Sequence, residues 1–427
     1  MNFVLKGNIC YSKTLQELEI KENSYLICEG GISKGVFSKI PDKYIGLPVT
    51  DYSDNIIIPG LCDLHIHAPQ YTFRGLGMNL QLLDWLNTHT FVEESRYDDL
   101  DYADKAYSAF VEDLKLSAVT RASIFATLHT SATILLMEKL EKTGLITMVG
   151  KVNMDRNSSD ILCEESPQKS YENTKKWIEE VIGKFKNTTP IITPRFIPTC
   201  TDELLTKLKE LQKTYKLPVQ SHLSESKKEI EWVKELYPDS ESYGDAYNQF
   251  GLFGGKDTPT IMAHCVWSKD SEEDLLKNQD VYVAHCPQSN TNLSSGIAPI
   301  RRFLKRGIHI GLGSDVAAGC HTSIFRAMSD AIQVSKLYWR LVDQEDEPLT
   351  ENEAFYLGTL GGGSFFGKVG SFDEGYEFDA IVIDDSSLAT PYKSPQKLTI
   401  EDRLAKIIYF HNDNSIRGKY VRGNKII

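Results

Sequence analysis

The sequence predicts an α/β fold in which a (β/α)8 TIM-like barrel is joined to a small β-sandwich domain. Short apolar runs recur through the middle of the chain, and stretches with helical spacing of apolar residues separate them. Both ends of the chain instead carry short alternating runs bounded by turn residues, which is typical of small antiparallel strands. We therefore expect residues 58–370 to form the barrel, and residues 1–57 and 371–427 to form the two parts of the sandwich.

The predicted barrel strands are apolar runs that alternate with helices. We place these strands at residues 56–58, 122–125, 145–149, 191–196, 219–221, 260–263, 281–284 and 308–312. Helices are expected between them, among others at residues 98–116, 172–185 and 226–236. In the terminal segments we expect strands at residues 3–5, 25–28, 35–37, 378–383, 406–410 and 419–423.

Composition and charge narrow the class of protein. The 427 residues are 41% hydrophobic and 25% charged, which is ordinary for a soluble protein with a full core. The formal net charge of −12 argues against a nucleic-acid duplex or an anionic membrane as a partner. The N-terminus lacks the pattern of a signal peptide, and the eight cysteines form no C-x-x-C pair. We therefore expect a cytoplasmic protein with reduced thiols.

Histidines and one aspartate occur at the ends of the predicted barrel strands. His65 and His67 follow the first run, and residues two apart in a strand point to the same side. The last four runs end in His222, His264, His285 and Asp315. Because the carboxyl ends of parallel barrel strands meet on one face, these side chains are expected to lie together.

The residue types in this group are those that bind a catalytic metal. Imidazole and carboxylate ligands suit zinc or ferrous iron and leave a position open for water. We predict that His65, His67, His222 and Asp315 hold one Zn²⁺ or Fe²⁺ in a hydrolase. His285 is expected to lie just outside the ligands, and the sequence leaves open whether Lys151, at the end of the third run, approaches the site. His89, His129, His309 and His411 do not fit the pattern and are expected to be structural or surface residues.

Glu225 is the candidate proton carrier of the site. It lies three residues after His222, where its carboxylate can lean over a metal-bound water and exchange protons with a substrate nitrogen. Glu229 and Glu231 lie further along the charged stretch 226–236 and are expected to be exposed surface acids.

The segments around these residues resemble the motifs of the amidohydrolase superfamily. They are PGLCDLHIH at 59–67, SHLSE at 221–225, MAHC at 262–265, AHCPQSN at 284–290 and GSD at 313–315. Within the superfamily, APQYTF at 68–73, LDWL at 83–86 and the pair Arg195-Phe196 are most similar to the guanine deaminases. The resemblance implies one metal ion per chain, and no lysine at the fourth strand offers the bridging ligand of dinuclear members. It also implies a homodimer and conversion of guanine to xanthine and ammonia.

The resemblance also implies roles for the residues of the site. Asp315 would take a proton from the attacking water, His264 would position the resulting hydroxide and contact the substrate, and Glu225 would protonate N3 of guanine. Arg195 presents a fixed fork of donors for O6 and N7, and Gln70 can both donate to and accept from the purine edge. Phe196 and Trp85 would supply walls for the flat ring, and residues 78–91 are a candidate lid.

Two other functions are compatible with parts of this pattern. A related deaminase or chlorohydrolase could use the same metal site for another amino-heterocycle, such as a triazine or an adenosine-like compound, and Gln70 and Arg195 are the residues that distinguish these substrates. A non-catalytic interaction scaffold is disfavoured, because the metal ligands and Glu225 are all present.

Overall fold

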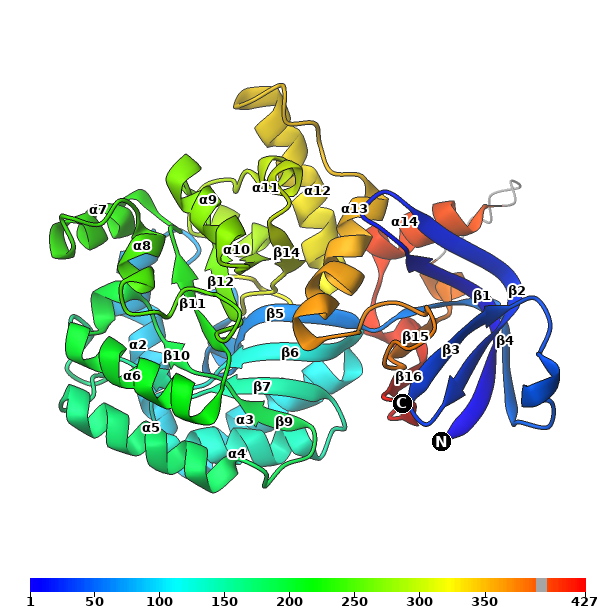
Figure 1. Ribbon diagram of the computed structural model, residues 1–427, viewed down its shortest axis with the longest axis horizontal. Coiled ribbons are helices and arrows are strands. Elements are labelled where there is room, and N and C mark those ends of the chain that lie inside the picture. The colour runs from blue at the N-terminus through cyan, green and yellow to red at the C-terminus, as the bar shows by residue number, and fades with distance from the viewer. Residues whose placement is uncertain (389–397) are drawn as a thin grey trace.

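The computed structural model describes residues 1–388 and 398–427 (Figure 1). From β5 (Leu61–His67) to β14 (His309–Leu312), helices separate most of the successive parallel strands. The two ends of the chain form a separate sheet beside them, on the right of Figure 1, where both termini also lie. In the described residues, no helix has both the length and the apolar character needed to cross a membrane.

The terminal segments join in one seven-stranded sheet with the order β17-β16-β15-β4-β1-β2-β3. Its strands are β1 (Asn2–Ser12), β2 (Leu18–Glu29), β3 (Ile32–Phe37), β4 (Val49–Pro59), β15 (Ala380–Ile383), β16 (Ile416–Val421) and β17 (Asn424–Lys425). Strands β4 and β15 pair antiparallel and so join the N-terminal part to the C-terminal part. The sequence led us to expect the two facing sheets of a sandwich, whereas the structure assigns these strands to a single sheet.

The sheet is buried on both faces where it meets the rest of the protein. Ile57 of β4 faces a small core with Phe378, whereas its neighbours Ile56 and Ile58 face the main core. A buried ion pair adds to the junction, because Nε of Arg121 donates to Asp379 at 2.6 Å. The terminal sheet is therefore fixed against the body that carries the site.

The parallel strands form two four-stranded sheets and one short pair. The first sheet has the order β5-β6-β7-β9, the second has the order β11-β12-β13-β14, and β10 pairs with β8. The strands are β6 (Val119–Phe125), β7 (Ile146–Gly150), β8 (Val152–Asn153), β9 (Thr188–Pro190), β10 (Thr193–Pro194), β11 (Val219–Leu223), β12 (Thr260–His264) and β13 (Tyr282–His285). A bridge between Ile192 and Val219 links the sheets at one side, and a hydrogen bond from Asp315 N to His65 O links them at the other.

Most predicted barrel strands coincide with observed strands. The runs at 122–125, 145–149, 219–221, 260–263, 281–284 and 308–312 lie in or overlap β6, β7 and β11 to β14. The run at 56–58 belongs to β4 of the terminal sheet, and the first parallel strand is β5, which contains the histidine pair itself. The run at 191–196 contributes only β10, because Pro190 and Pro194 interrupt the ladder.

Helices surround the parallel strands, as Figure 1 shows. The α-helices are α1 (Leu82–Trp85), α2 (Phe91–Ser95), α3 (Leu100–Leu116), α4 (Thr130–Glu141), α5 (Pro167–Val181), α6 (Asp202–Tyr215), α7 (Lys227–Leu236), α8 (Tyr243–Asn248), α9 (Asp270–Asn278), α10 (Pro287–Asn292), α11 (Ile300–Arg306), α12 (Ile324–Leu341), α13 (Glu351–Tyr356) and α14 (Ile400–Phe410). Short 3-10 or π segments are η1 (Asp42–Tyr44), η2 (Ala68–Phe73), η3 (Leu86–Thr90), η4 (Arg96–Asp98), η5 (Ile197–Thr199), η6 (Leu357–Gly361), η7 (Ser364–Phe366), η8 (Asp385–Leu388) and η9 (Asp413–Ser415). The helices predicted at 98–116, 172–185 and 226–236 correspond to α3, α5 and α7.

The strand predicted at 406–410 is wrong, because these residues end the helix α14. Thr399 caps this helix in a capping box with Asp402. Its buried residues Ile400, Leu404 and Ile407 follow helical spacing, so the apolar run at 406–410 is only the end of an amphipathic pattern.

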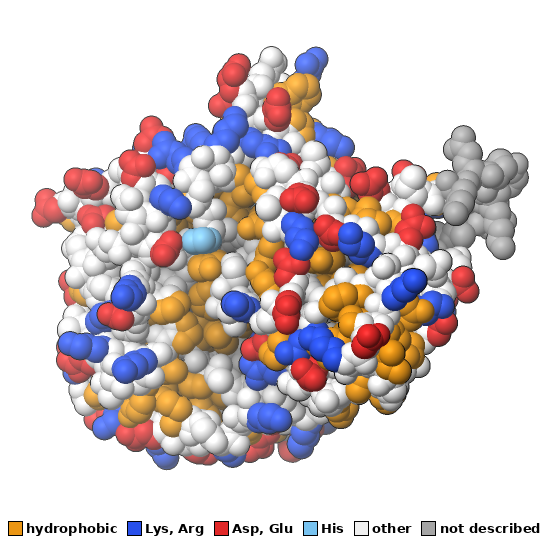
Figure 2. All heavy atoms as spheres, turned by 45° about the vertical axis from the view of Figure 1, so that its right-hand side comes forward, with side chains coloured by type: hydrophobic (Ala, Val, Ile, Leu, Met, Phe, Trp, Pro, Cys, Tyr) orange, Lys and Arg blue, Asp and Glu red, His pale blue; other side chains and the backbone are white. Residues whose placement is uncertain are grey.

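The surface carries both signs of charge despite the acidic total. Figure 2 shows acidic and basic side chains interspersed over the face that it displays, with apolar side chains between them. The net charge is therefore not concentrated in one field on that face.

Candidate active site

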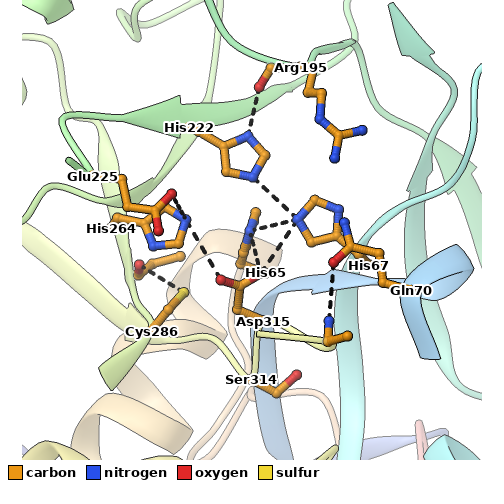
Figure 3. Close-up of polar contacts among 12 residues, drawn as sticks. His65, His67, Gln70, Arg195, His222, Glu225, His264, Cys286, Ser314 and Asp315 are labelled. Atoms are coloured by element: carbon orange, nitrogen blue, oxygen red, sulfur yellow. Dashed lines mark hydrogen bonds and ion pairs between the residues drawn. The ribbon is translucent and has the colours of Figure 1, made fainter. Parts of the chain in front are cut away.

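The histidine pair of β5 forms one side of a compact group of metal-binding atoms. Nε2 of His67 lies 3.2 Å from Nε2 of His65 and 3.2 Å from Nε2 of His222, at the end of β11 (Figure 3). Oδ1 of Asp315 lies 3.2 Å from Nε2 of His65 and 3.5 Å from Nε2 of His67. The structure thus brings all four predicted ligands together, at the carboxyl ends of their strands.

The protonation of these side chains fits a bound cation. Burial lowers the pKa of His65, His67 and His222 and so favours the neutral imidazoles, the form that binds a metal. Burial acts to raise the pKa of Asp315, but the imidazoles of His65 and His264 beside it hold that pKa well below its usual range. Three imidazole nitrogens and a carboxylate oxygen that approach one another to 3.2–3.5 Å are the kind of ligand set that a divalent metal takes. The group therefore fits a divalent metal.

A buried aspartate orients the two strand ends that supply ligands. Oδ1 of Asp63 accepts from the backbone nitrogens of His65 and Ser314, each at 3.1 Å, and its Oδ2 accepts from the Ser314 hydroxyl at 2.5 Å. Burial raises the pKa of Asp63 to about 7. Asp315 follows Ser314 directly in the chain. Its φ of 47° lies in a region that non-glycine residues rarely adopt. The network holds Asp315 in this conformation and aims it at the histidines.

His264 and Glu225 face each other beside the ligands. Nε2 of His264 lies 3.5 Å from Glu225 Oε2 and 3.7 Å from Asp315 Oδ2, while its Nδ1 donates to Asn290 Oδ1 at 2.9 Å. Burial alone would lower the pKa of His264, but the carboxylates of Glu225 and Asp315 raise it. Burial raises the pKa of Glu225, whose Oε1 accepts from the Ser295 hydroxyl at 2.9 Å. An acid with a raised pKa beside a histidine is suited to proton transfer.

Glu229 was expected to be exposed, and that prediction is wrong. Glu229 is 1% exposed, and it lies beside Glu225 instead of facing solvent. Oε2 accepts from the backbone nitrogens of Glu225 and Ser226, and Oε1 accepts from the Tyr243 hydroxyl. The capping box Ser226-x-x-Glu229 at the start of α7 is a sequence signal for this inward position, because it ties the glutamate to the strand end. Glu231 is exposed, as predicted.

A cavity lies over the group of candidate ligands, and both polar and apolar side chains form its walls. It is lined by His67, Gln70, Leu82, Trp85, Leu86, Arg195, Phe196, His222, Glu225, Glu229, His264, Leu293, Asp315 and Ala318. In Figure 3, Glu225 and His264 lie to the left of His65, while Gln70 and the guanidinium group of Arg195 lie to the right of it. The cavity therefore has a proton-transfer end and an end with hydrogen-bond donors.

The predicted substrate contacts all line this cavity. Arg195 and Phe196 follow β10, Gln70 lies in η2, and Trp85 ends α1. The Trp85 side chain is 2% exposed and its Nε1 donates to Leu76 O at 3.1 Å, so its orientation is fixed. The candidate lid at residues 78–91 contributes Leu82, Trp85 and Leu86 to the wall.

Neither Lys151, whose approach to the site the sequence left open, nor His285, which was expected just outside the ligands, lines the cavity. Lys151 is buried and its Nζ contacts Glu164 Oε1 at 2.7 Å, so it is held in a structural ion pair. His285 is also buried, and in the described part of the chain neither of its ring nitrogens has a hydrogen-bond partner. Burial lowers the pKa of His285 to about 3, and the nearby His264 adds to the effect.

One buried acid at the donor end was not anticipated from the sequence. Glu94 in α2 is 1% exposed and contacts both Arg195 and Gln70. It lies outside every predicted strand end, in a short segment where two adjacent glutamates read as an ordinary polar helix face. No local pattern marks it, because its partners come from two distant segments.

Comparison with known proteins places this arrangement in a family. The model of the amidohydrolase family matches residues 56–426. The guanine deaminase of Dictyostelium discoideum is 38% identical over 99% of this chain and 98% of its own length. Among solved structures, guanine deaminase from C. acetobutylicum with bound guanine has a TM-score of 0.96 and 46% identity, and each chain is covered completely.

More distant structures share the fold only. Triazine hydrolase from Arthobacter aurescens has a TM-score of 0.84 at 15% identity, over 99% of this chain and 94% of its own. The chain belongs to the amidohydrolase family, and its full-length relatives named above are guanine deaminases.

Proposed function

We propose that this protein hydrolyses guanine to xanthine and ammonia. The observation that carries the proposal is the position of Arg195 and Gln70, which line one end of the cavity over the ligand group. Their donors and acceptor match the O6, N7 and N1 edge of guanine. The likeness over the whole chain to a guanine-bound deaminase supports the same substrate.

We further propose that His65, His67, His222 and Asp315, whose donor atoms converge, hold one Zn²⁺, or Fe²⁺, per chain. When bound, such an ion lowers the pKa of a water molecule and supplies hydroxide near neutral pH. Analysis of the metal content of the purified protein distinguishes the two ions and tests the scaffold alternative, which requires no metal.

The proton transfers follow from the positions of Glu225, His264 and Asp315. Asp315 takes one proton from the attacking water, and His264 donates a hydrogen bond to its oxygen. Glu225 protonates N3, which makes C2 electrophilic, and the water oxygen bonds to C2. The proton on Asp315 passes to the amino group, the C2–N bond breaks and ammonia leaves. The remaining hydroxyl proton passes to Glu225, so that a C2 carbonyl forms and the acid is restored.

Specificity follows from the other end of the cavity. The guanidinium of Arg195 donates to O6 and N7, and the amide of Gln70 bonds to the adjacent edge. Trp85 and Phe196, which are 2% and 4% exposed, lie as walls along the ring. A ring without these acceptors leaves buried donors unpaired, which is costly.

The arrangement of domains is proposed as follows. The two parallel sheets and the pair β8–β10 are the parts of one closed (β/α)8 barrel formed by residues 58–370. The bridge between Ile192 and Val219 on one side and the hydrogen bond from Asp315 N to His65 O on the other support this closure. Residues 1–57 and 371–427 together form one accessory β domain.

We also propose a cytoplasmic location, with which the eight free cysteines agree. The protein is further proposed to be a homodimer, and light scattering of the native protein tests this.

A substrate panel tests the proposed function. Ammonia release is measured with guanine, adenosine and an amino-triazine, using protein loaded with Zn²⁺. We expect guanine to be preferred by about 10⁴-fold in kcat/KM, the discrimination typical of sites that hydrogen-bond their substrate. Turnover of the nucleoside or the triazine with none of guanine would contradict the proposal.

A further inference from the structure

Glu94 holds the side chain of Arg195 from behind the cavity. Nη1 of Arg195 donates to Glu94 Oε2 at 2.6 Å, and its Nη2 donates to Oε1 at 3.1 Å. Both side chains are buried, and the Phe91 ring lies 5.2 Å from the guanidinium carbon. Bidentate pairing of this kind fixes the plane of the guanidinium as well as its position.

The same carboxylate also fixes Gln70. Nε2 of Gln70 donates to Glu94 Oε1 at 2.9 Å, and its Oε1 accepts from the backbone nitrogen of Ala317 at 3.1 Å. Because a carboxylate can only accept and a backbone N–H can only donate, the two ends of the Gln70 amide are assigned without ambiguity. Glu94 thus connects the two residues that read the substrate, although it does not line the cavity itself.

We propose that Glu94 is a positioning residue that sets both the geometry and the charge of the purine-reading end. It holds Arg195 and Gln70 in the orientation that fits a neutral purine. It also cancels the charge of Arg195, so that this end of the cavity does not retain an anionic ring. The inference rests on the proposed guanine deaminase function and deepens it.

The charge balance matters because the product is more acidic than the substrate. Deamination replaces the amino group on C2 by a carbonyl group, so the product has ring N–H groups beside or between carbonyls, and these ionise more readily. A cavity with an unbalanced arginine would hold the resulting anion and slow product release. A cavity with the Arg195–Glu94 pair has no net charge to hold it.

The test compares Glu94→Gln and Glu94→Asp with the wild-type protein, all loaded with Zn²⁺. We expect Glu94→Gln to raise the KM for guanine by about tenfold or more, because charge-assisted hydrogen bonds that orient Arg195 are lost, with a smaller change in kcat. Xanthine is expected to inhibit the Glu94→Gln variant more strongly as pH rises and xanthine ionises. Relative to wild type, we expect the inhibition constant for xanthine to fall by about tenfold. Glu94→Asp keeps the charge, so we expect a raised KM with the wild-type pH dependence of xanthine inhibition.

Glu93→Gln is the matched control, because Glu93 is also buried in α2 but contacts Thr72 and Tyr102 instead. It is expected to leave both the KM and xanthine inhibition unchanged. Wild-type KM and wild-type xanthine inhibition in both Glu94 variants would overturn the inference. Calorimetric binding of guanine and xanthine to each variant separates this outcome from failure of the proposed function, in which the wild-type protein neither binds nor deaminates guanine.

Discussion

The imidazole of His222 donates from Nδ1 to the backbone carbonyl of Arg195 at 2.6 Å. Because a carbonyl oxygen can only accept, Nδ1 carries the proton and the lone pair of Nε2 points at His67 and the other ligands. The same short contact links the proposed metal ligand His222 to Arg195, the residue proposed to bind the substrate. The two proposed functions therefore meet at the end of β11.

Replacing His222 tests the metal centre. His222→Ala removes one ligand nitrogen and is expected to lower the bound metal to well below one ion per chain, with a loss of activity of about 100-fold or more. Metal content by elemental analysis and ammonia release are the measurements. His309→Asn is the control, since His309 is half-buried at the start of β14 and stacks on Tyr282 outside the cavity. Full metal content in His222→Ala would contradict the ligand assignment.

Replacing Arg195 tests the recognition of the substrate. Arg195→Ala keeps the backbone carbonyl that accepts from His222, so metal content is expected to be unchanged. The KM for guanine is expected to rise by about 10- to 100-fold, because the charge-assisted hydrogen bonds from Arg195 to the substrate are lost. Steady-state kinetics measure this KM, and Arg417→Ala is the control because Arg417 is exposed. A wild-type KM in Arg195→Ala would remove this residue from the binding site.

Replacing Glu225 tests the proton carrier. Glu225→Gln retains an oxygen that can accept from Ser295 but cannot deliver a proton to N3. We expect kcat to fall by about 10²- to 10⁴-fold while the bound metal is retained. The control is Glu231→Gln on the exposed face of α7. A kcat within the range of that control would rule out the assigned role.

The buried carboxyl of Glu229 gives stability a defined pH dependence. Burial and the charge of Glu225 raise the pKa of Glu229 from 4.5 to about 7. Between these values the folded protein binds a proton that the unfolded chain has lost. The contribution of Glu229 to the free energy of unfolding is therefore full below about pH 4.5 and is lost as pH rises through about 7.

Glu229→Gln removes this titration while keeping an oxygen for the two backbone donors. From pH 4.5 to 7 we expect the wild-type free energy of unfolding to fall by about 3 kcal/mol relative to this variant. Chemical denaturation of metal-free protein at several pH values measures it, with Glu235→Gln as an exposed control. A constant difference between Glu229→Gln and wild type across this range would show that Glu229 does not titrate there.

The ligand group could be predicted from the sequence because its residues lie at or just after the ends of predicted strands. His65 and His67 share one side of a strand by simple alternation, and His222 and Asp315 end apolar runs that parallel strands bring to one face. Each of these positions can be found from local pattern alone. The same reasoning predicts that Glu225 lies close to His222.

Other features depend on contacts between distant segments and could not be predicted. The position of Glu94 is fixed by its ion pair with Arg195, which is 101 residues away in the chain. The sequence around Glu94 does not differ from that of an ordinary helix. The run at 56–58 satisfies every rule for a barrel strand, but its pairing with β15 places it in the terminal sheet. The apolar run at 406–410 fits a strand until the cap at Thr399 is included.

The central claim is that the ligand group binds the metal that guanine deamination requires, and one titration tests it most directly. The protein is stripped with a chelator, and ammonia release from guanine is measured as Zn²⁺ or Fe²⁺ is returned. We predict that the stripped protein is inactive and that activity returns in proportion to bound metal, reaching its maximum at one ion per chain. Full activity of the metal-free protein, or no guanine turnover at any metal content, would contradict the account.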